Sequence, residues 1–317
     1  MTSLISQLVN TAPLIHRVPT LGGMFKRAKY VARGVVTARA TREWFDFLQQ
    51  RELAVVIRNH PCLYHKLQRP YLTCILTTQQ RLDALKQHYH FVLANFSSET
   101  VERLYGIGGL RLASFVLDDL GQFELRLTCS RREKEGDFSA SLVKIGTPKD
   151  AYSLSFSVWK YDAPPKEIFI GGLQGSHYAN KDIVVSLTRA LYGLRPKALL
   201  VFVVQQLAMC WGISNLRAVS DATHIYRHFQ KRKELSTSYD EFWVDCGGKL
   251  SSAGTFEFPA AFVPREISTI KANKRQMYRR RYELLANFAD QIHAAFQNDI
   301  EREVGRGDML SVSPKES

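Results

Sequence analysis

The chain has few cysteines, no long uninterrupted apolar run and no repeated or low-complexity segment. Its five cysteines are scattered and none forms a Cys-x-x-Cys pair, so neither a disulfide framework nor a zinc site is predicted. The most apolar stretch, residues 198–213, is interrupted by Gln205 and Gln206 and is too short to span a bilayer. Residues 1–23 lack the charged start and sustained apolar run of a signal peptide. These absences predict a soluble, cytoplasmic protein with reduced cysteines.

Acidic residues are the scarcer charge, since 43 Lys and Arg stand against 30 Asp and Glu and the formal net charge is +13. Such an excess favours anionic partners, namely nucleic acid, an acidic membrane surface or an anionic small molecule. No recognised nucleic-acid-binding motif is present, which disfavours the first class. An anionic small molecule and a peripheral contact at the inner membrane both stay open as expectations, and the sequence is silent on the oligomeric state.

The periodicity of the apolar residues changes twice along the chain. It is helical and basic over residues 24–50, and helical again over 77–95. After a glycine cluster at 106–109, short β-branched segments separated by turn-forming residues indicate an antiparallel meander. Its strands are expected at 111–117, 123–129, 139–145, 152–159 and 167–170.

After the glycine pair at 171–172 the period becomes helical again. The helix expected at 195–211 is apolar on nearly every face and should be buried against the sheet. Further helices are expected at 182–192, 223–233 and 265–296, and strands at 216–219, 242–244 and 255–258. The glycine-bearing junction from Ile168 to Pro196 is therefore the expected functional centre.

These elements predict an α+β protein in which a helical N-terminal portion precedes a mixed, mostly antiparallel sheet flanked by helices. The expected divisions are a basic helical region over 1–105, an α/β core over 106–264, and a basic C-terminal helix and tail over 265–317. The order of elements in the core resembles the Gcn5-related N-acetyltransferase (GNAT) fold. That resemblance implies an acyltransferase-like core.

The GNAT resemblance implies acetyl-CoA or another acyl-CoA as cofactor. In that family the loop before the buried helix binds the cofactor pyrophosphate through backbone N–H groups and the helix N-terminus. The family loop reads Gln/Arg-x-x-Gly-x-Gly/Ala, and the nearest segment here has one extra residue and no second glycine. The implied cofactor-binding residues are Arg189, Gly193, Leu194 and Arg195. The alternative is that Gly193 only ends one helix and Pro196 begins the next.

The same resemblance implies candidate catalytic residues. Tyr226 would lie on the helix that in GNAT enzymes often carries a tyrosine general acid, and its alternative role is packing on the sheet. Glu241 flanks an expected strand and is the candidate base, with Asp245 beside it, although exposed carboxylates are usually only solvated. No Ser/His/Asp or Cys/His arrangement has the context of a nucleophile.

A second resemblance covers most of the chain. The segments that carry it are Ile168–Gly175, Leu191–Lys197, Ala208 with Trp211–Ile213, Ala218–Asp221 and Lys274–Tyr282. Together they resemble the VirK/YbjX family of enterobacterial proteins. The resemblance implies a role in virulence, stress response and resistance to antimicrobial peptides, and it implies no catalytic residues.

Basic residues gather in the expected C-terminal helix around Tyr278 and Tyr282. Tyrosines among arginines can lie at a layer of phosphates, so Arg279, Arg280 and Arg281 are predicted to bind an anion. A solvated, partly ion-paired helix is the alternative, because the charges point several ways. His224 and His228 have metal-compatible spacing, but no third ligand is nearby in sequence and no metal is predicted.

Overall fold

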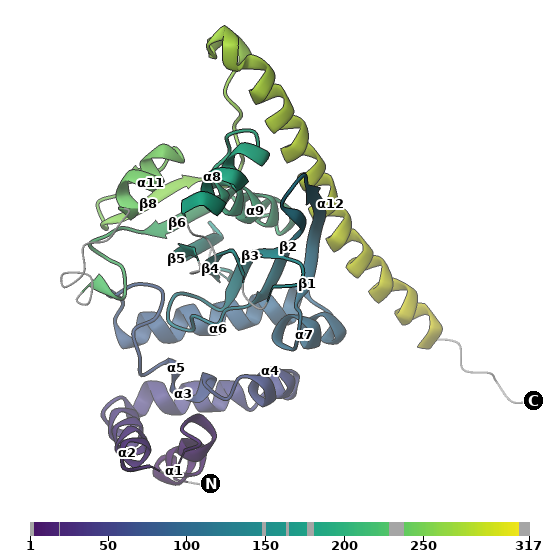
Figure 1. Cartoon of the computed structure of the whole chain (residues 1–317). Coiled ribbons are helices and arrows are strands. Elements are labelled where there is room, and N and C mark those ends of the chain that lie inside the picture. Colours follow the sequence, from purple (N-terminus) through teal and green to yellow (C-terminus); the bar gives the residue numbers. More distant parts are fainter. Residues whose placement is uncertain are drawn as a thin grey trace, which may run out of the picture.

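The computed structural model describes residues 3–18, 20–147, 150–162, 165–175, 181–227 and 238–310, with side chains described as far as residue 297 except that of residue 181. Its N-terminal third is helical (Figure 1). The helices are α1 (Leu4–Ile15), α2 (Leu21–Val36), α3 (Ala38–Leu48), α4 (Ala54–Asn59), α5 (Leu63–Lys66), α6 (Thr78–Asn95) and α7 (Ser98–Tyr105), with a 3₁₀ turn at Arg51–Leu53.

Local sequence explains where these helices begin and end. The Thr77 hydroxyl accepts the Gln80 N–H while the Gln80 side chain accepts the Thr77 N–H, a capping box that begins α6. The single helical segment expected over 24–50 is two helices, because the chain leaves helical geometry at Thr37. The Thr37 hydroxyl donates to the Arg33 carbonyl, and such a bond competes with the backbone pattern of a helix.

One eight-stranded sheet follows, with strand order β1-β2-β3-β4-β5-β6-β8-β7. Every pair is antiparallel except β5 with β6, which are parallel. The strands are β1 (Leu110–Leu117), β2 (Gly121–Cys129), β3 (Phe138–Lys144), β4 (Tyr152–Trp159), β5 (Glu167–Gly175), β6 (Asn215–Val219), β7 (Lys249–Leu250) and β8 (Thr255–Pro259). The mixed, mostly antiparallel sheet flanked by helices is confirmed.

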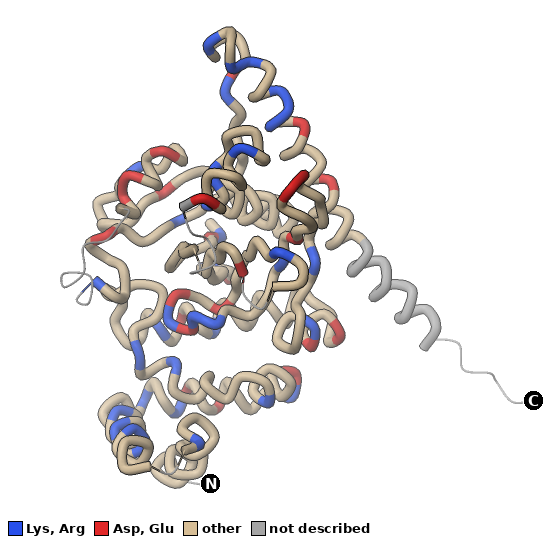
Figure 2. The backbone as a smooth tube through the Cα atoms, viewed as in Figure 1, with Lys and Arg blue, Asp and Glu red and all other residues tan. Residues whose placement is uncertain are grey.

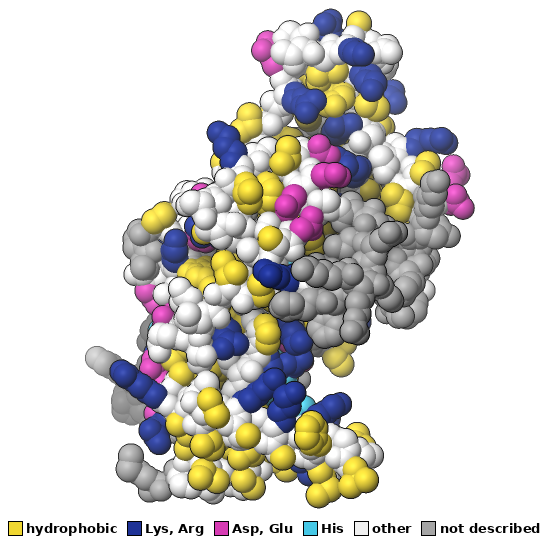
Figure 3. Space-filling model, turned by 90° about the vertical axis from the view of Figure 1, so that its left-hand side faces the viewer, with side chains coloured by type: hydrophobic (Ala, Val, Ile, Leu, Met, Phe, Trp, Pro, Cys, Tyr) yellow, Lys and Arg dark blue, Asp and Glu magenta, His cyan; other side chains and the backbone are white. Residues whose placement is uncertain are grey.

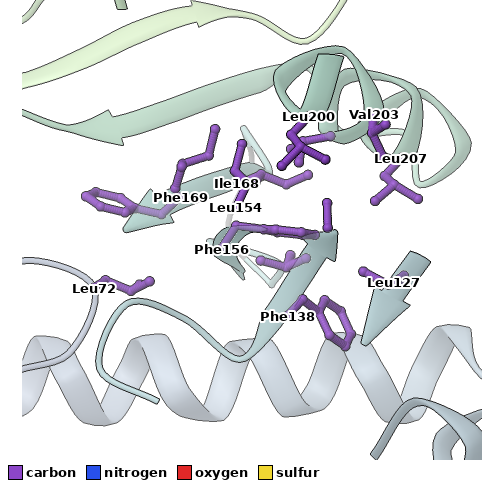
Figure 4. Close-up of a cluster of buried hydrophobic side chains, with 14 of the residues drawn as sticks. Leu72, Leu127, Phe138, Leu154, Phe156, Ile168, Phe169, Leu200, Val203 and Leu207 are labelled. Atoms are coloured by element: carbon purple, nitrogen blue, oxygen red, sulfur yellow. The ribbon is translucent and has the colours of Figure 1, made fainter. Parts of the chain in front are cut away.

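The second half adds α8 (Lys181–Ala190), α9 (Pro196–Cys210), α11 (Tyr239–Asp245), a 3₁₀ turn at Ile267–Thr269 and α12 (Ala272–Leu310). Helix α9 connects the two parallel strands, as such a crossover requires. Its residues Leu199–Ala208 are all buried, which confirms the burial expected of this helix. In Figure 4, Leu200, Val203 and Leu207 face Leu154, Phe156 and Ile168 of the sheet. No described helix is long and apolar enough to cross a membrane.

One expected element is wrong, and another is described only in part. Residues 242–244, expected as a strand, belong to helix α11, which begins where the Ser238 side chain accepts the Glu241 N–H. The helix expected over 223–233 is not formed at residues 223–226, where the chain turns, whereas Arg227 is helical and residues 228–233 lie outside the described residues. The Thr223 carbonyl accepts hydrogen bonds from the Thr73 hydroxyl and the Cys74 N–H, so the N-terminal region holds this turn.

A buried carboxylate joins the N-terminal helices to the sheet. The Asp137 carboxylate accepts from Lys66 Nζ at 2.5 Å, from the Tyr71 hydroxyl at 2.5 Å and from the Tyr89 hydroxyl at 2.5 Å. The buried Lys66 ammonium and these hydroxyls hold the pKa of the Asp137 carboxyl well below its usual range, although burial alone would raise it. This network fixes the loop before β3, and the neighbouring Glu135 lies in that loop.

Candidate functional site

The parallel strands part at the middle of β5. Strand β5 pairs with β6 only through Glu167–Ile170, whereas its second half, Gly171–Gly175, pairs only with β4. At the point of parting, the β4–β5 register jumps, because Ser155 lies opposite Gly172 and Phe156 lies opposite Ile170. Gly171 is thus the extra residue of a β-bulge, a device that bends a strand and is common beside active sites. Strand β6 ends at Val219, so no described strand continues beside Gly171–Gly175 on that side.

The loop between β2 and β3 lies against this half of β5. A Cβ atom on Gly171 would overlap the Glu135 carbonyl oxygen, and one on Gly172 would overlap the Glu135 carboxylate. Both positions therefore require glycine so that Glu135 can lie directly on β5. The glycine pair that marked this junction in the sequence allows Glu135 to pack closely against strand β5.

Glu135 is a buried carboxyl with incomplete hydrogen bonding. Its side chain is fully buried, Oε1 accepts from Gln174 Nε2 at 2.7 Å, and Oε2 has no hydrogen-bond partner in the structure. Burial raises the pKa of this carboxyl to about 7, against smaller opposing effects of Arg132 and of the Gln174 hydrogen bond. A carboxyl with such a pKa can accept or release a proton at neutral pH, as a general base requires.

Aromatic side chains cover Glu135. His224 Nε2 lies 3.8 Å from Glu135 Oε1, and the His224 ring stacks on that of Tyr239 with centroids 5.1 Å apart. The Tyr239 hydroxyl bonds to the N–H and the carbonyl of Leu173 in β5. Burial lowers the pKa of His224 to about 4, so its ring is neutral at neutral pH.

Tyr226, a predicted catalytic residue, lies in the same cluster. Its ring centroid is 5.7 Å from that of His224, and Lys134 Nζ lies 5.2 Å from the ring centroid of Tyr226. Burial and, secondarily, the nearby Glu135 carboxyl raise the pKa of Tyr226, so its hydroxyl keeps its proton. Glu241 is elsewhere, since it is exposed in the first turn of α11.

A polar cavity of about 550 Å³ adjoins the cluster on the sheet. Residues Ser139 and Ser141 alternate along β3 with residues of the apolar core and so face the opposite side of the strand. Ser155 lines the cavity and lies opposite Gly172 in the sheet, whereas Glu135 itself does not line the cavity. The other polar residues that line the cavity are Arg126, Thr128, Ser130, Arg131, Arg132, Asp150, Ser153 and His60.

A second cavity, of about 630 Å³, begins at the loop between α8 and α9. The predicted cofactor-binding residues Gly193, Leu194 and Arg195 line it, together with Arg281 of α12. The loop has left-handed backbone geometry at Tyr192 (φ 52°) and Gly193 (φ 77°), and the Tyr192 carbonyl accepts from Arg281 Nε at 3.0 Å and Nη2 at 2.8 Å.

The structure does not bring all the predicted binding residues to this cavity. Arg195 is half-exposed and forms an ion pair with Asp245 at 2.7 Å. Arg189 is exposed and does not line this cavity. Arg279 and Arg280 are exposed on α12, so of the three predicted anion-binding arginines only Arg281 lines the cavity. Glu135 does not line it either.

Sequence reasoning missed Glu135. It stands in the charged run Arg131-Arg-Glu-Lys-Glu-Gly-Asp137, which has the composition of a solvated turn. Only the glycine pair at 171–172 carried a signal of close backbone approach, and it did not say what approaches. His228, which has metal-compatible spacing to His224 in the sequence, lies outside the described residues. Among the side chains that are described, no three of the types His, Cys, Asp and Glu gather closely enough to hold a metal ion.

Comparison with known proteins confirms the resemblance to the VirK/YbjX family. The family model described as "Protein of unknown function (DUF535)" matches residues 20–294. The chain is 31% identical over 277 residues to "Uncharacterized protein YbjX" of Escherichia coli strain K12, covering 86% of this chain and 83% of the relative.

Two relatives from Haemophilus influenzae, each named "Uncharacterized protein", are more distant. One is 29% identical over 270 residues, with 83% of this chain and 87% of the relative covered. The other is 30% identical over 156 residues, about half of each chain. No solved structure matches the chain. Because the family model spans most of the sequence and YbjX is related over nearly its whole length, the chain belongs to the DUF535 family.

Proposed function

We propose that the chain is an acyl-CoA-dependent acyltransferase in which Glu135 is the general base. The observation that carries the proposal is the buried carboxyl of Glu135, whose pKa burial raises to about 7, beside the point where pairing ends between the only two parallel strands among the described strands. The strand order and the crossover through a buried helix support a GNAT-like arrangement. In such an arrangement the parting strands flank the cofactor.

The residues around the α8–α9 loop fit an anionic cofactor. Arg195 and Arg281 are cationic, and the 15-residue helix α9 begins beside them with its uncompensated N–H groups. Pro196 at the first turn of α9 needs no partner for its nitrogen. These groups would hold the pyrophosphate. When bound, the cofactor supplies an activated thioester.

The chain's own residues would then move two protons. The Glu135 carboxylate accepts the proton that an acceptor amine loses as its nitrogen bonds to the acyl carbon. The Tyr226 hydroxyl, whose raised pKa keeps its proton available, would donate that proton to the sulfur that leaves when the thioester C–S bond breaks. The serine- and arginine-lined cavity beside Ser155 would receive a polar acceptor.

Binding and turnover test separate parts of this proposal. Isothermal titration with acetyl-CoA should show binding that Gly193→Asp abolishes and Arg195→Ala weakens. Release of free thiol in the presence of primary amines should fall at least 100-fold in Glu135→Gln with binding intact, because one general base contributes roughly 10²–10⁴-fold. Glu133→Gln, two residues away and partly exposed, is the matched control. Absence of any binding at millimolar acetyl-CoA would contradict the proposal.

The cellular role we propose is the one that the family resemblance implies, namely envelope-stress and virulence functions that include resistance to antimicrobial peptides. A strain that carries Glu135→Gln should then be as sensitive to a cationic peptide as the deletion strain, whereas Glu133→Gln should restore resistance. A resistant Glu135→Gln strain would separate the cellular role from the chemistry.

A non-enzymatic anion binder is the second candidate, favoured by the exposed Arg279 and Arg280 on α12. Affinity for a nucleic acid or membrane that falls steeply with salt, and falls further in Arg279→Ala/Arg280→Ala, would support it. Salt-insensitive binding would exclude it.

A further inference from the structure

Helix α2 has a large apolar face that the described residues leave open to solvent. Leu21 is 87% exposed, Phe25 70% and Val36 85%, and Met24 and Val35 are also exposed. At 3.6 residues per turn these five residues lie on one side of the helix, together with the exposed Ala28 and Ala32. Leucine, phenylalanine and valine rarely gather on an open surface unless that surface has a partner.

The opposite side of α2 is packed against α1, which fixes the apolar face outward. Tyr30 is buried and its hydroxyl lies 2.8 Å from that of Thr11 in α1. Gly34 lies so close to Leu8 of α1 that a Cβ atom would overlap the leucine side chain. The Arg27 side chain donates two hydrogen bonds to the His16 carbonyl just after α1. The apolar face is thus the outer surface of a packed helix pair.

Apolar exposure is concentrated at this end of the molecule. Nine of the eighteen large hydrophobic residues that are exposed fall between residues 5 and 36, the others in this range being Ile5, Val9, Leu14 and Val18. Figure 3 shows hydrophobic side chains gathered over the lower end of the molecule, where α1 and α2 lie in Figure 1. Lys and Arg side chains adjoin them.

The charges around this surface have one sign. The first 42 residues of the sequence contain seven Lys and Arg and no Asp or Glu. Figure 2 shows basic residues along α2 and no acidic residue along either α1 or α2. Lys26, Lys29 and Arg33 follow a stripe of α2 that borders the apolar face, because they are spaced three and four residues apart.

The same stripe borders a cavity of about 280 Å³, which is also lined by His16, His65, Gln68 and Arg69. The Gln68 side chain is only 8% exposed, yet neither its Nε2 nor its Oε1 has a hydrogen-bond partner. Burial and the neighbouring cations lower the pKa of His65 to about 3, so its ring is neutral and adds no charge. Lys26, Lys29 and Arg33 form no ion pair with another described residue and supply positive charge at the rim, whereas Arg69 is partly balanced by Glu133 at 3.2 Å.

We propose that this end of the molecule, α1 and α2, docks on the surface of an anionic lipid bilayer. The outward face of α2 lies in the boundary between headgroups and acyl chains, and the cavity beside Lys29 and Arg33 takes a lipid phosphate. An interfacial helix has this construction, with an apolar face bordered by Lys and Arg. The charge argues against a second copy as the occupant, since two such surfaces would bring only cations together.

Vesicle co-sedimentation tests the proposal. We expect the full chain to sediment with phosphatidylcholine vesicles that contain phosphatidylglycerol and to sediment weakly with phosphatidylcholine alone. Lys26→Ala/Lys29→Ala/Arg33→Ala should lower the affinity for anionic vesicles on the order of 100-fold, since each cation near such a surface contributes about a fivefold factor. Leu21→Ser/Phe25→Ser should reduce binding at least tenfold. All the replaced side chains are exposed, so circular dichroism and Tm should not change.

Matched controls replace equally exposed residues elsewhere. Ile107→Ser/Val263→Ser removes two exposed apolar side chains, and Arg58→Ala/Arg103→Ala removes two exposed cations. Both controls should bind vesicles as the unaltered chain does, and equal losses in the controls and the α2 variants would overturn the proposal.

Two other outcomes would also overturn it. One is a concentration-dependent dimer in sedimentation velocity that Leu21→Ser/Phe25→Ser abolishes, without vesicle binding. The other is a thermal shift with inorganic phosphate alone, lost in the triple variant, again without vesicle binding.

Discussion

Replacing Glu135 by glutamine should change how stability depends on pH. In the folded chain the Glu135 carboxyl has a pKa of about 7, raised from 4.5 by burial, so it binds its proton more tightly when folded than when unfolded. The stabilisation from that proton is fully present below the unfolded pKa and is lost as the pH rises through the folded pKa. The relevant window is therefore between pH 4.5 and about 7.

The magnitude follows from the two pKa values. Between about pH 5 and about pH 8.5 the unaltered chain should lose roughly 2.5 kcal/mol of unfolding free energy through this group, at 1.36 kcal/mol per pH unit. Glu135→Gln cannot titrate at this position and should lack that loss. Its amide can still accept from Gln174 but leaves an unsatisfied donor where Oε2 stood, a pH-independent cost of about 1 kcal/mol.

Urea unfolding at both pH values measures this difference. Because the cost of the amide is the same at each pH, it cancels when the unaltered chain and Glu135→Gln are compared across the two conditions. Near pH 8.5 the variant should be the more stable protein, and near pH 5 the less stable. Glu133→Gln leaves Glu135 in place, so this control should keep the loss of unfolding free energy that the Glu135 carboxyl causes between the two pH values. An equal change in unfolding free energy between the two pH values for the unaltered chain and for Glu135→Gln would refute the reasoning. The Glu135 carboxyl would then have the same pKa in the folded and the unfolded chain.

Three further predictions concern stability and are checked by urea unfolding near neutral pH. Asp137→Ala leaves the Lys66 ammonium buried without its counter-charge and should lower the free energy of unfolding by about 3–5 kcal/mol. A loss below about 1 kcal/mol would show that water reaches the lysine. Gly171→Ala should lower the free energy of unfolding by about 1–3 kcal/mol, because the new Cβ atom would overlap backbone atoms of Glu135. Gly22→Ala, which has open space around it in α2, should leave that free energy unchanged or raise it. Arg281→Ala removes two hydrogen bonds to the Tyr192 carbonyl and should lower the free energy of unfolding by about 1.5–3 kcal/mol. An unchanged free energy would mean that the α8–α9 loop keeps its conformation without Arg281.

Sequence patterns predicted the elements whose burial is uniform. Helix α9 is apolar on all sides and strand β4 has β-branched and aromatic residues, so both were located within a residue or two. The segment 242–244 misled because Phe-Trp-Val favours a strand, whereas the cap at Ser238 and the acidic first turn of α11 decided for a helix. Local capping outweighed the propensity of three residues.

The candidate site was predictable only in part, because its parts are distant in sequence. The loop 193–195 was found from its glycine and the proline that follows, both of which are local signals. Glu135 meets Gln174 and His224 only through the sheet register, and no pattern within a short window records that contact. Tyr226 was proposed from an expected helix, and it lies beside Glu135 although the chain turns there instead.

The outward apolar face of α2 shows a second limit of periodicity. A helix with apolar residues on two sides does not reveal from its sequence which side is packed, and large side chains are normally assigned to the core. In α2 the packed side holds Gly23, Tyr30 and Gly34, and at Gly34 the Leu8 side chain of α1 leaves no room for a Cβ atom. The buried Tyr30 ring fills the rest of this side, and the leucine, methionine and phenylalanine are left outside. Large apolar residues on the outer side of a packed helix are the arrangement expected if that side lies on a membrane surface, as we propose.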